Sequence, residues 1–114
     1  MKKINSRQKG KRGERYFVNF MKKIWPIARR NAGVQSQSGG VDIENTGCFN
    51  FEVKCGKENT LKKVRSWITQ IKEEGQKANY GCVLVKPERE EPYVVLPFDD
   101  FFAILQTMKA EGIL

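Results

Sequence analysis

The chain is predicted to form an α/β fold with a mixed sheet flanked by helices, and three observations support this. Apolar residues recur at helical spacing in three segments, and alternating or continuous apolar runs typical of strands lie between them. The length of 114 residues suits one modest domain, so we treat 1–114 as a single unit. The longest apolar runs are too short to span a bilayer, and we expect a cytoplasmic protein with no membrane partner.

The elements are expected in the order α-β-β-β-α-β-β-α. A basic arm at 1–9 has little to bury and precedes the first helix. The expected elements are a helix from about Lys11 until Pro26 stops it, a short edge strand within 27–34, a loop at 35–40, strands at 41–44 and 48–54, a helix from Asn59 or Thr60 to about Lys77, strands at 81–86 and 93–96, and a helix from Asp99 or Asp100 to about Lys109.

The residue types present exclude several classes of enzyme. The chain has no histidine, which excludes Ser-His-Asp and Cys-His catalysis as well as zinc or iron sites bound by histidine. Its three cysteines form no CxxC pair and are typical of a reducing compartment. Any catalysis would therefore depend on carboxylates, lysines, hydroxyls or a hard metal ion bound by oxygen.

Positive charge is concentrated at one end of the chain. Residues 1–30 carry 11 lysine and arginine residues against a single acidic residue, whereas the remainder carries 10 basic and 12 acidic residues. A basic segment beside a nearly neutral body is typical of a nucleic-acid-binding protein. A solubilising surface is one alternative, and binding of the basic first helix to a membrane surface is another.

The hairpin expected at 39–54 carries the residues best suited to chemistry. Alternate residues of a strand share a face, so Glu52 and Lys54 lie together on the face opposite the phenylalanines. The turn at 45–47 ends in Gly47, which suits the positive-φ position of a three-residue hairpin loop. The polar face of this hairpin is therefore a candidate site.

The turn also predicts a register for the hairpin. A three-residue turn pairs Glu44 with Cys48 and sets Asp42 opposite Asn50. Asp42 then lies diagonal to Glu52, with Cβ atoms roughly 7 Å apart. A two-residue turn would put Asp42 on the phenylalanine face, where its charge is unfavourable.

Two neighbouring carboxylates repel each other unless one is protonated or a cation lies between them. Mg²⁺ or Mn²⁺ is the natural occupant of such a site in a chain without histidine. Lys54, on the same face, is placed to hold a water nucleophile or to neutralise charge on a phosphate. The alternative is a solvated strand face with an ion pair between Glu52 and Lys54.

Two helical residues are further candidates. Glu14, the one acidic residue among the first 30, borders the apolar stripe of the first helix and should face a partner. An ion pair with Arg15, Lys11 or a distant lysine is the alternative. Gln70 follows Trp67 by three residues, and it either orients a site residue or is an ordinary boundary glutamine.

Four segments occur along the chain as KGKRGERYF (9–17), SGGVDI (38–43), FEVK (51–54) and TQIKEEG (69–75). In content and order they resemble the PD-(D/E)XK nuclease superfamily, and within it the small Holliday-junction-resolvase-like enzymes of phages and archaea. The resemblance implies a restriction-endonuclease-like αβββαβ core. One departure is Val41, which stands where a proline often precedes the aspartate.

The resemblance also implies roles for individual residues. Asp42 and Glu52 would bind Mg²⁺, or Mn²⁺ in its place, and Lys54 would be the catalytic lysine. Further residues with implied roles are Glu14 and the backbone carbonyl of Val53 at the metal, Gln70 as a helical glutamine found in many members, and Ser38 as a serine near the metal-binding loop.

The implied activity is metal-dependent hydrolysis of phosphodiester bonds in branched DNA by a homodimer, as in DNA recombination, leaving a 5′-phosphate and a 3′-hydroxyl. Residues expected to contact phosphates are Lys9, Lys11, Arg12, Arg15, Arg29 and Arg30. One alternative is another nuclease of the same fold that cuts flaps or ends or nicks DNA. The other is a non-catalytic basic protein that binds DNA or RNA.

Overall fold

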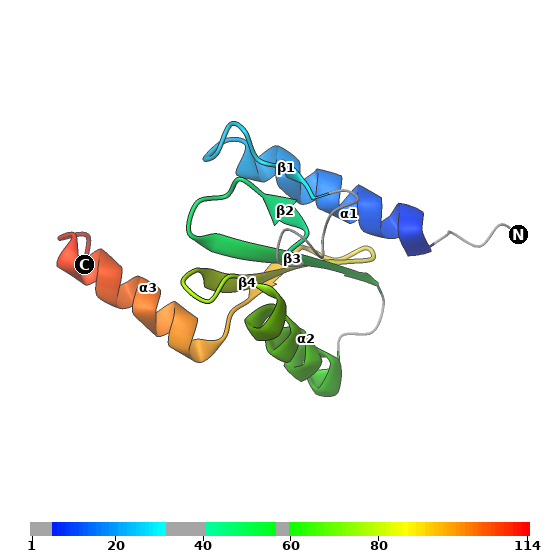
Figure 1. Ribbon diagram of the computed structural model, residues 1–114. Coiled ribbons are helices and arrows are strands. Elements are labelled where there is room, and N and C mark those ends of the chain that lie inside the picture. Colours follow the sequence, from blue (N-terminus) through cyan, green and yellow to red (C-terminus); the bar gives the residue numbers. More distant parts are fainter. Residues whose placement is uncertain (1–5, 32–40, 57–59) are drawn as a thin grey trace, which may run out of the picture.

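The computed structural model describes residues 6–31, 41–56 and 60–114, which form a five-stranded mixed sheet flanked by three helices (Figure 1). The elements are α1 (Ser6–Met21), β1 (Arg29–Arg30), β2 (Ile43–Glu44), β3 (Phe49–Gly56), α2 (Leu61–Glu74), β4 (Tyr80–Pro87), β5 (Tyr93–Val95) and α3 (Phe98–Ala110). The strands lie in sequence order, with β3 and β4 parallel and the other neighbours antiparallel. This confirms the predicted α/β class and element order, including the short edge strand. None of the described helices is long and apolar enough to cross a membrane.

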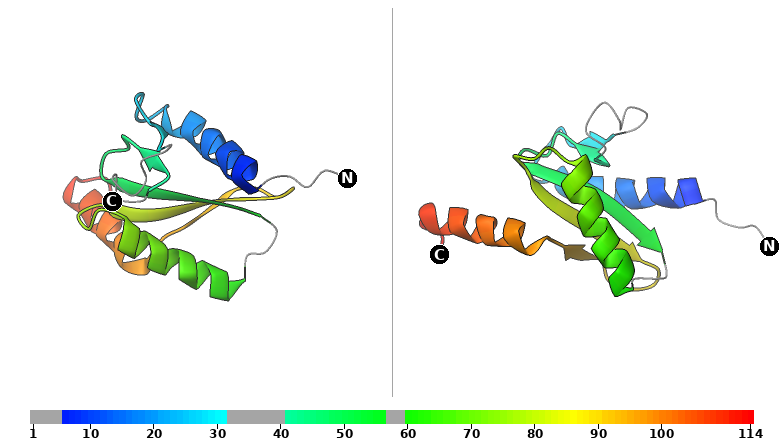
Figure 2. Two further views of the ribbon diagram at one scale, coloured as in Figure 1. Left: turned by 45° about the vertical axis from the view of Figure 1, so that its right-hand side comes forward. Right: turned by 60° about the horizontal axis from the view of Figure 1, so that its bottom comes forward.

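Helices α1 and α2 cover opposite faces of the sheet (Figures 1 and 2). The core under α1 contains Phe17, Val18, Ala28, Ile43, Phe51, Cys82 and Leu84. The core under α2 contains Trp67, Ile71, Val83 and Val85. Strand β4 contributes to both, as expected for an almost continuously apolar strand that is buried on both faces.

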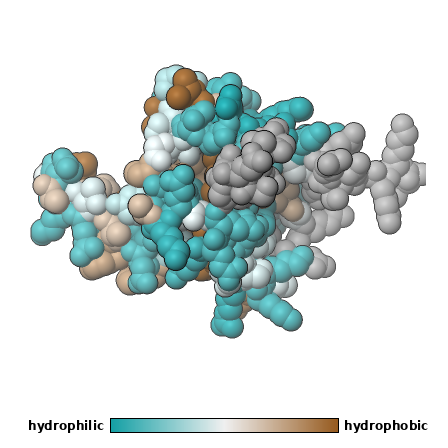
Figure 3. Space-filling view, in the orientation of Figure 1, coloured by the Kyte–Doolittle hydropathy of each residue, from teal (hydrophilic) through white to brown (hydrophobic). Residues whose placement is uncertain are grey.

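Helix α3 projects away from the sheet, and none of its residues is buried (Figure 2). Its first residue is Phe98 and its N-cap is Pro97, so the predicted cap at Asp99 or Asp100 is wrong. The carboxylate of Asp100 instead accepts a hydrogen bond from the backbone N–H of Gly81 at 2.9 Å, which ties the helix to β4. Figure 3 shows apolar atoms gathered over α3.

The first helix differs from the prediction at both ends. It begins at Ser6, because good helix formers such as Arg7 and Gln8 extend an established helix at little cost. The predicted arm at 1–9 is therefore wrong for 6–9, and 1–5 lie outside the described residues. The helix ends at Met21 and does not reach Pro26, because the chain tightens there: the N–H groups of Lys23 and Ile24 each donate at 3.0 Å to the carbonyl three residues back.

The second helix begins as predicted and ends earlier. The hydroxyl of Thr60 accepts a hydrogen bond from the N–H of Lys63 at 3.3 Å, which confirms Thr60 as the N-cap. The helix ends at Glu74, short of Lys77, because the chain turns at Gly75 where a side chain would collide with Asn50. The alternative cap Asn59 and the predicted loop 35–40 lie outside the described residues.

The hairpin register is shifted by two residues from the prediction. Ile43 pairs with Phe51, which makes the connection longer than the three-residue turn we expected. Asn45 and Gly47 both adopt positive φ, and the Thr46 hydroxyl donates to the Phe49 carbonyl at 3.0 Å. The predicted positive φ of Gly47 is confirmed. A shift of two residues preserves the face of every side chain, so only the pairing along the strands was wrong.

Helix α1 lies close to β3 at Gly13. A methyl group on Gly13 would lie 2.2 Å from the Sγ of Cys55 and 3.3 Å from a methyl of Val53, whereas one on Gly10 would meet nothing within 4 Å. We predict that Gly13→Ala lowers the free energy of unfolding by about 1–3 kcal/mol, because crowding outweighs the gain in helix propensity. Urea denaturation provides the measurement.

The matched control is Gly10→Ala in the same helix, which should stabilise the protein by up to about 1 kcal/mol. Removing the sulfur with Cys55→Ala should relieve most of the cost of Gly13→Ala. Equal stabilisation by Gly13→Ala and Gly10→Ala would contradict the close packing at this position.

Candidate active site

Asp42 and Glu52 lie together on the face of the sheet that α2 covers. Ile43 pairs with Phe51, and the N–H of Asp42 also donates to the carbonyl of Phe51 at 3.0 Å, so Asp42 lies next to Glu52 just before β2 begins. The predicted pairing of Asp42 with Asn50 is therefore wrong. Both side chains are buried, with 9% and 3% of their surface exposed. The carboxylate of Asp42 accepts a hydrogen bond from the backbone N–H of Val53 at 2.8 Å. The fold thus brings two carboxyl groups together out of contact with bulk water.

This environment makes a charged Glu52 unfavourable. Burial, followed by the charge of Asp42 and a hydrogen bond with its carboxyl group, raises the pKa of Glu52 to about 9. No N–H or O–H group in the described part of the chain donates to the Oε1 atom of Glu52. Glu52 is therefore protonated at neutral pH unless a cation neutralises the pair.

Helix α2 connects Lys54 to the carboxyl pair through Gln70. The Nζ of Lys54 donates to the Oε1 of Gln70 at 2.7 Å. The amide nitrogen of Gln70 faces two carboxylates, Glu74 at 3.0 Å and Glu52 at 3.5 Å. Gln70 therefore contacts both Lys54 and Glu52.

Glu14 approaches the same site from α1. Its Oε1 accepts a hydrogen bond from the Nε of Arg30 at 2.9 Å, and both side chains are largely buried. Burial first, and then the charge of Asp42, raises the pKa of Glu14, and Arg30 opposes that rise. Glu14 is thus close enough to Asp42 to feel its charge. Its ion-pair partner is Arg30, and not the neighbouring Arg15 or Lys11 that we considered.

The backbone of Val53 borders the site. The N–H and C=O groups of a strand residue point to the same side of the strand, and the N–H of Val53 points at Asp42. The carbonyl of Val53 therefore faces the edge of β3 next to Asp42. The resemblance implied a role for this carbonyl as a metal ligand.

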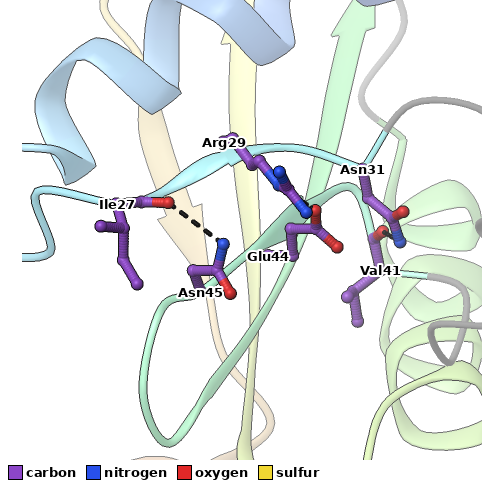
Figure 4. A network of polar contacts seen from close by, with 6 residues as sticks. All are labelled: Ile27, Arg29, Asn31, Val41, Glu44 and Asn45. Carbon is purple, nitrogen blue, oxygen red and sulfur yellow. Dashed lines mark hydrogen bonds and ion pairs between the residues drawn. The ribbon is translucent and has the colours of Figure 1, made fainter.

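The basic residues fall into two groups. Lys11, Arg12 and Arg15 are exposed on α1, whereas Arg29 pairs with Glu44, as Figure 4 shows, and Arg30 pairs with Glu14. Lys9 lies within α1, in the part whose side chains the structure does not describe, and Ser38 lies outside the described residues.

Two further basic residues, Lys86 and Arg89, lie near α1 and were not predicted from the sequence. A cavity of about 270 Å³ is lined by Arg12, Gly13, Tyr16, Cys55, Lys86, Pro87, Glu88 and Arg89. The Nζ of Lys86 lies 5.4 Å from the centre of the Tyr16 ring. Arg89 was hard to recognise because the acidic residues Glu88 and Glu90 flank it in the sequence, and only folding brings it to Arg12.

No protein-family model, curated protein or solved structure matches the chain.

The residues at the site fit a divalent cation. A hard cation such as Mg²⁺ is commonly held by one or two carboxylates and keeps several water molecules. Asp42 and Glu52 supply the carboxylates, and the Oε1 of Glu52 lacks a hydrogen-bond donor among the described residues. Within 6–31, 41–56 and 60–114, no cluster of three or more acidic, cysteine or histidine side chains is suited to a metal ion.

The raised pKa of Glu52 predicts how stability depends on pH in EDTA. Between the ordinary value of 4.5 and about 9, the folded protein holds a proton that the unfolded chain has released. The free energy of unfolding should therefore fall as the pH rises through this range, by at most about 1.4 kcal/mol per pH unit. Urea denaturation from pH 5 to 8 measures this slope.

Glu52→Gln should remove that contribution. The free energy of unfolding of the variant should therefore increase relative to that of the wild type as the pH rises. Glu73→Gln, at an exposed carboxylate on the same helix as Gln70, is the matched control and should follow the wild type. Parallel pH profiles for the wild type and Glu52→Gln would show that Glu52 titrates normally.

Proposed function

We propose that the protein is a metal-dependent DNA endonuclease with a restriction-endonuclease-like core, selective for branched DNA such as Holliday junctions. The observation that carries the proposal is the buried pair of Asp42 and Glu52, with Lys54 linked to it through Gln70. A structural ion pair would not need two adjacent buried carboxyl groups. The order from α1 to β4 is compatible with the αβββαβ arrangement implied by the resemblance.

Each residue of the site has a role in this proposal. Asp42 and Glu52 would hold Mg²⁺ or Mn²⁺, with the Val53 carbonyl beside them. Bound there, the ion supplies Lewis-acid polarisation of a phosphate oxygen and lowers the pKa of bound water. Lys54 places a positive charge where negative charge develops on the phosphate, and Gln70 holds its amine in position by accepting a hydrogen bond. Glu14 adds a further carboxylate, restrained by Arg30.

The charge distribution supports DNA as the substrate. The net charge is +8, and the exposed side chains of Lys11, Arg12 and Arg15 lie on α1, the helix that also carries Glu14. Cationic side chains bind the phosphate backbone with little dependence on sequence and with a strong dependence on salt. A nuclease that selects DNA by its shape needs this kind of contact more than it needs contacts to bases.

The activity is tested with labelled four-way junction, flap, linear duplex and single-stranded DNA in Mg²⁺, Mn²⁺ or EDTA. We predict paired symmetric cuts in the junction that leave a 5′-phosphate and a 3′-hydroxyl and that disappear in EDTA. Asp42→Asn and Glu52→Gln should each lower the cleavage rate by at least about a hundredfold, because each removes a charge that the reaction needs. Both variants should still bind the DNA.

The matched control is Glu44→Gln, which changes a carboxylate on the same face that pairs with Arg29, and it should still cleave. Metal-dependent cuts in flaps, ends or single strands would support the proposed site but contradict the preference for junctions, and the protein would then be another kind of nuclease. Binding without cleavage, insensitive to metal and to both site variants, would indicate a non-catalytic DNA- or RNA-binding protein.

We also propose that the protein acts as a homodimer, since two symmetric cuts require two sites. The apolar surface of α3 supports this proposal, because Phe98, Phe101 and Phe102 are 74%, 44% and 49% exposed. Contiguous apolar surface of this kind commonly marks an interaction site.

In analytical ultracentrifugation, the wild type should sediment as a dimer, and Phe101→Asp with Phe102→Asp should shift it to a monomer. The monomer should nick junctions without pairing the cuts. Gln106→Asp, at an exposed polar position of the same helix, should remain dimeric. A wild type that is monomeric at all concentrations would contradict the homodimer.

A further inference from the structure

Three polar residues form a row across the sheet on the face that α2 covers. Arg29 pairs with Glu44 and Arg30 with Ile43, so the next residue, Asn31, lies opposite Asp42. A hydrogen bond of 2.9 Å from the N–H of Asn31 to the carbonyl of Asp42 continues this pairing. The side chain of Asp42 in turn shares a hydrogen bond with that of Glu52 on β3. Asn31 therefore flanks the carboxyl pair on one side.

The side chain of Asn31 is held in one orientation. It is 3% exposed, and its Nδ2 donates to the carbonyl of Val41 at 2.9 Å (Figure 4). Exchanging the oxygen and nitrogen of the amide would set its oxygen against that carbonyl oxygen, with no proton between them. The Val41 carbonyl thus determines which atom of the amide is turned away from it, and that atom is the Oδ1.

The Oδ1 of Asn31 has no hydrogen-bond donor among the residues that the structure describes. Among the described residues, only one other buried side-chain oxygen or nitrogen lacks a hydrogen-bond partner, and it is the Oε1 of Glu52. A buried oxygen without a donor is costly, and such atoms in a folded protein call for a specific explanation. Both of these oxygens belong to the row that Asp42 occupies, so a single occupant would explain both.

We propose that Asn31 is a positioning residue of the cation site, and that its Oδ1 accepts a hydrogen bond from a water molecule bound to the cation. This inference rests on the cation required by the proposed function. Asn31 and Glu52 lie on either side of β2, roughly 10 Å apart at the backbone, so a short amide reaches a bound water more readily than the ion itself. Mg²⁺ and Mn²⁺ sites held by two carboxylates retain such waters.

A structural role for Asn31 must be distinguished from this one. Its two hydrogen bonds join the end of β1 to residues 41 and 42, so they would hold the chain together in the absence of any cation. Two substitutions separate the roles. Asn31→Leu removes both the donor and the oxygen, whereas Asn31→Asp removes the donor to Val41 and keeps an oxygen acceptor.

The experiment measures Mn²⁺ binding to the full chain by electron paramagnetic resonance of the free ion, without DNA. We expect Asn31→Leu to weaken binding by about tenfold or more, in the range observed for residues that hold metal ligands or bound water. Asn31→Asp should restore the affinity to within about threefold of the wild type. The matched control is Asn45→Gly, which removes a similar amide bond to the Ile27 carbonyl at a residue of positive φ, and it should bind like the wild type.

Thermal unfolding in EDTA, and again with Mn²⁺, provides a second measurement on the same variants. Asn31→Asp should unfold at a lower temperature than the wild type in EDTA, and Mn²⁺ should restore its unfolding temperature. The reason is that the oxygen at this position receives its hydrogen bond only when the cation and its water are bound. This comparison of Asn31→Asp with the wild type does not depend on whether Asn31→Leu folds. Equal losses of Mn²⁺ affinity in Asn31→Leu and Asn31→Asp would overturn the inference in favour of the structural role.

Two further outcomes separate this inference from the proposed function. Binding of Mn²⁺ that Glu52→Gln abolishes and Asn31→Leu leaves unchanged would overturn the role of Asn31 and retain the cation site. A wild type that binds no Mn²⁺, or binds it as well in Glu52→Gln, would overturn both together.

Discussion

The central physical constraint in this structure is that Asp42 and Glu52 cannot both carry a charge where the fold places them. Burial and mutual repulsion favour the neutral form of Glu52 and raise its pKa to about 9. A stabilising core would ordinarily use apolar side chains at such positions, since neither carboxyl group adds to the packing. Their burial side by side beneath α2 is the structural observation on which the proposed function depends.

The surrounding elements are arranged around this constraint. The parallel pairing of β3 with β4 is spanned by α2, which places Gln70 between Lys54 and Glu52. The close approach of α1 to β3 at Gly13 brings Glu14 within electrostatic reach of Asp42. The site is therefore built from both faces and one edge of the sheet, with each charged group restrained by a partner from another element.

Much of the fold could be predicted because hydrophobic periodicity reports local structure directly. The alternation of phenylalanines with polar residues in β3 and the continuous apolar run of β4 identified the central strands. Helix ends were less predictable, because they depend on tertiary contacts: Asp100 is engaged by the Gly81 N–H, and Gly75 packs against Asn50. The same limit applied to ion pairs, since the partner of Glu14 lies 16 residues away on β1.

The sequence by itself determined which residues of the hairpin share a face, because a period of two survives any even shift in register. It thereby identified Asp42, Glu52 and Lys54 as neighbours in a chain without histidine. Only the tertiary structure decided that Ile43 pairs with Phe51 and that the two carboxyl groups are in hydrogen-bond contact, because the conformation of the loop at 45–48 and its packing against Trp25 set the pairing. It also decided that Asn31 joins their row, since the edge strand aligns with β2 through contacts that no local pattern encodes.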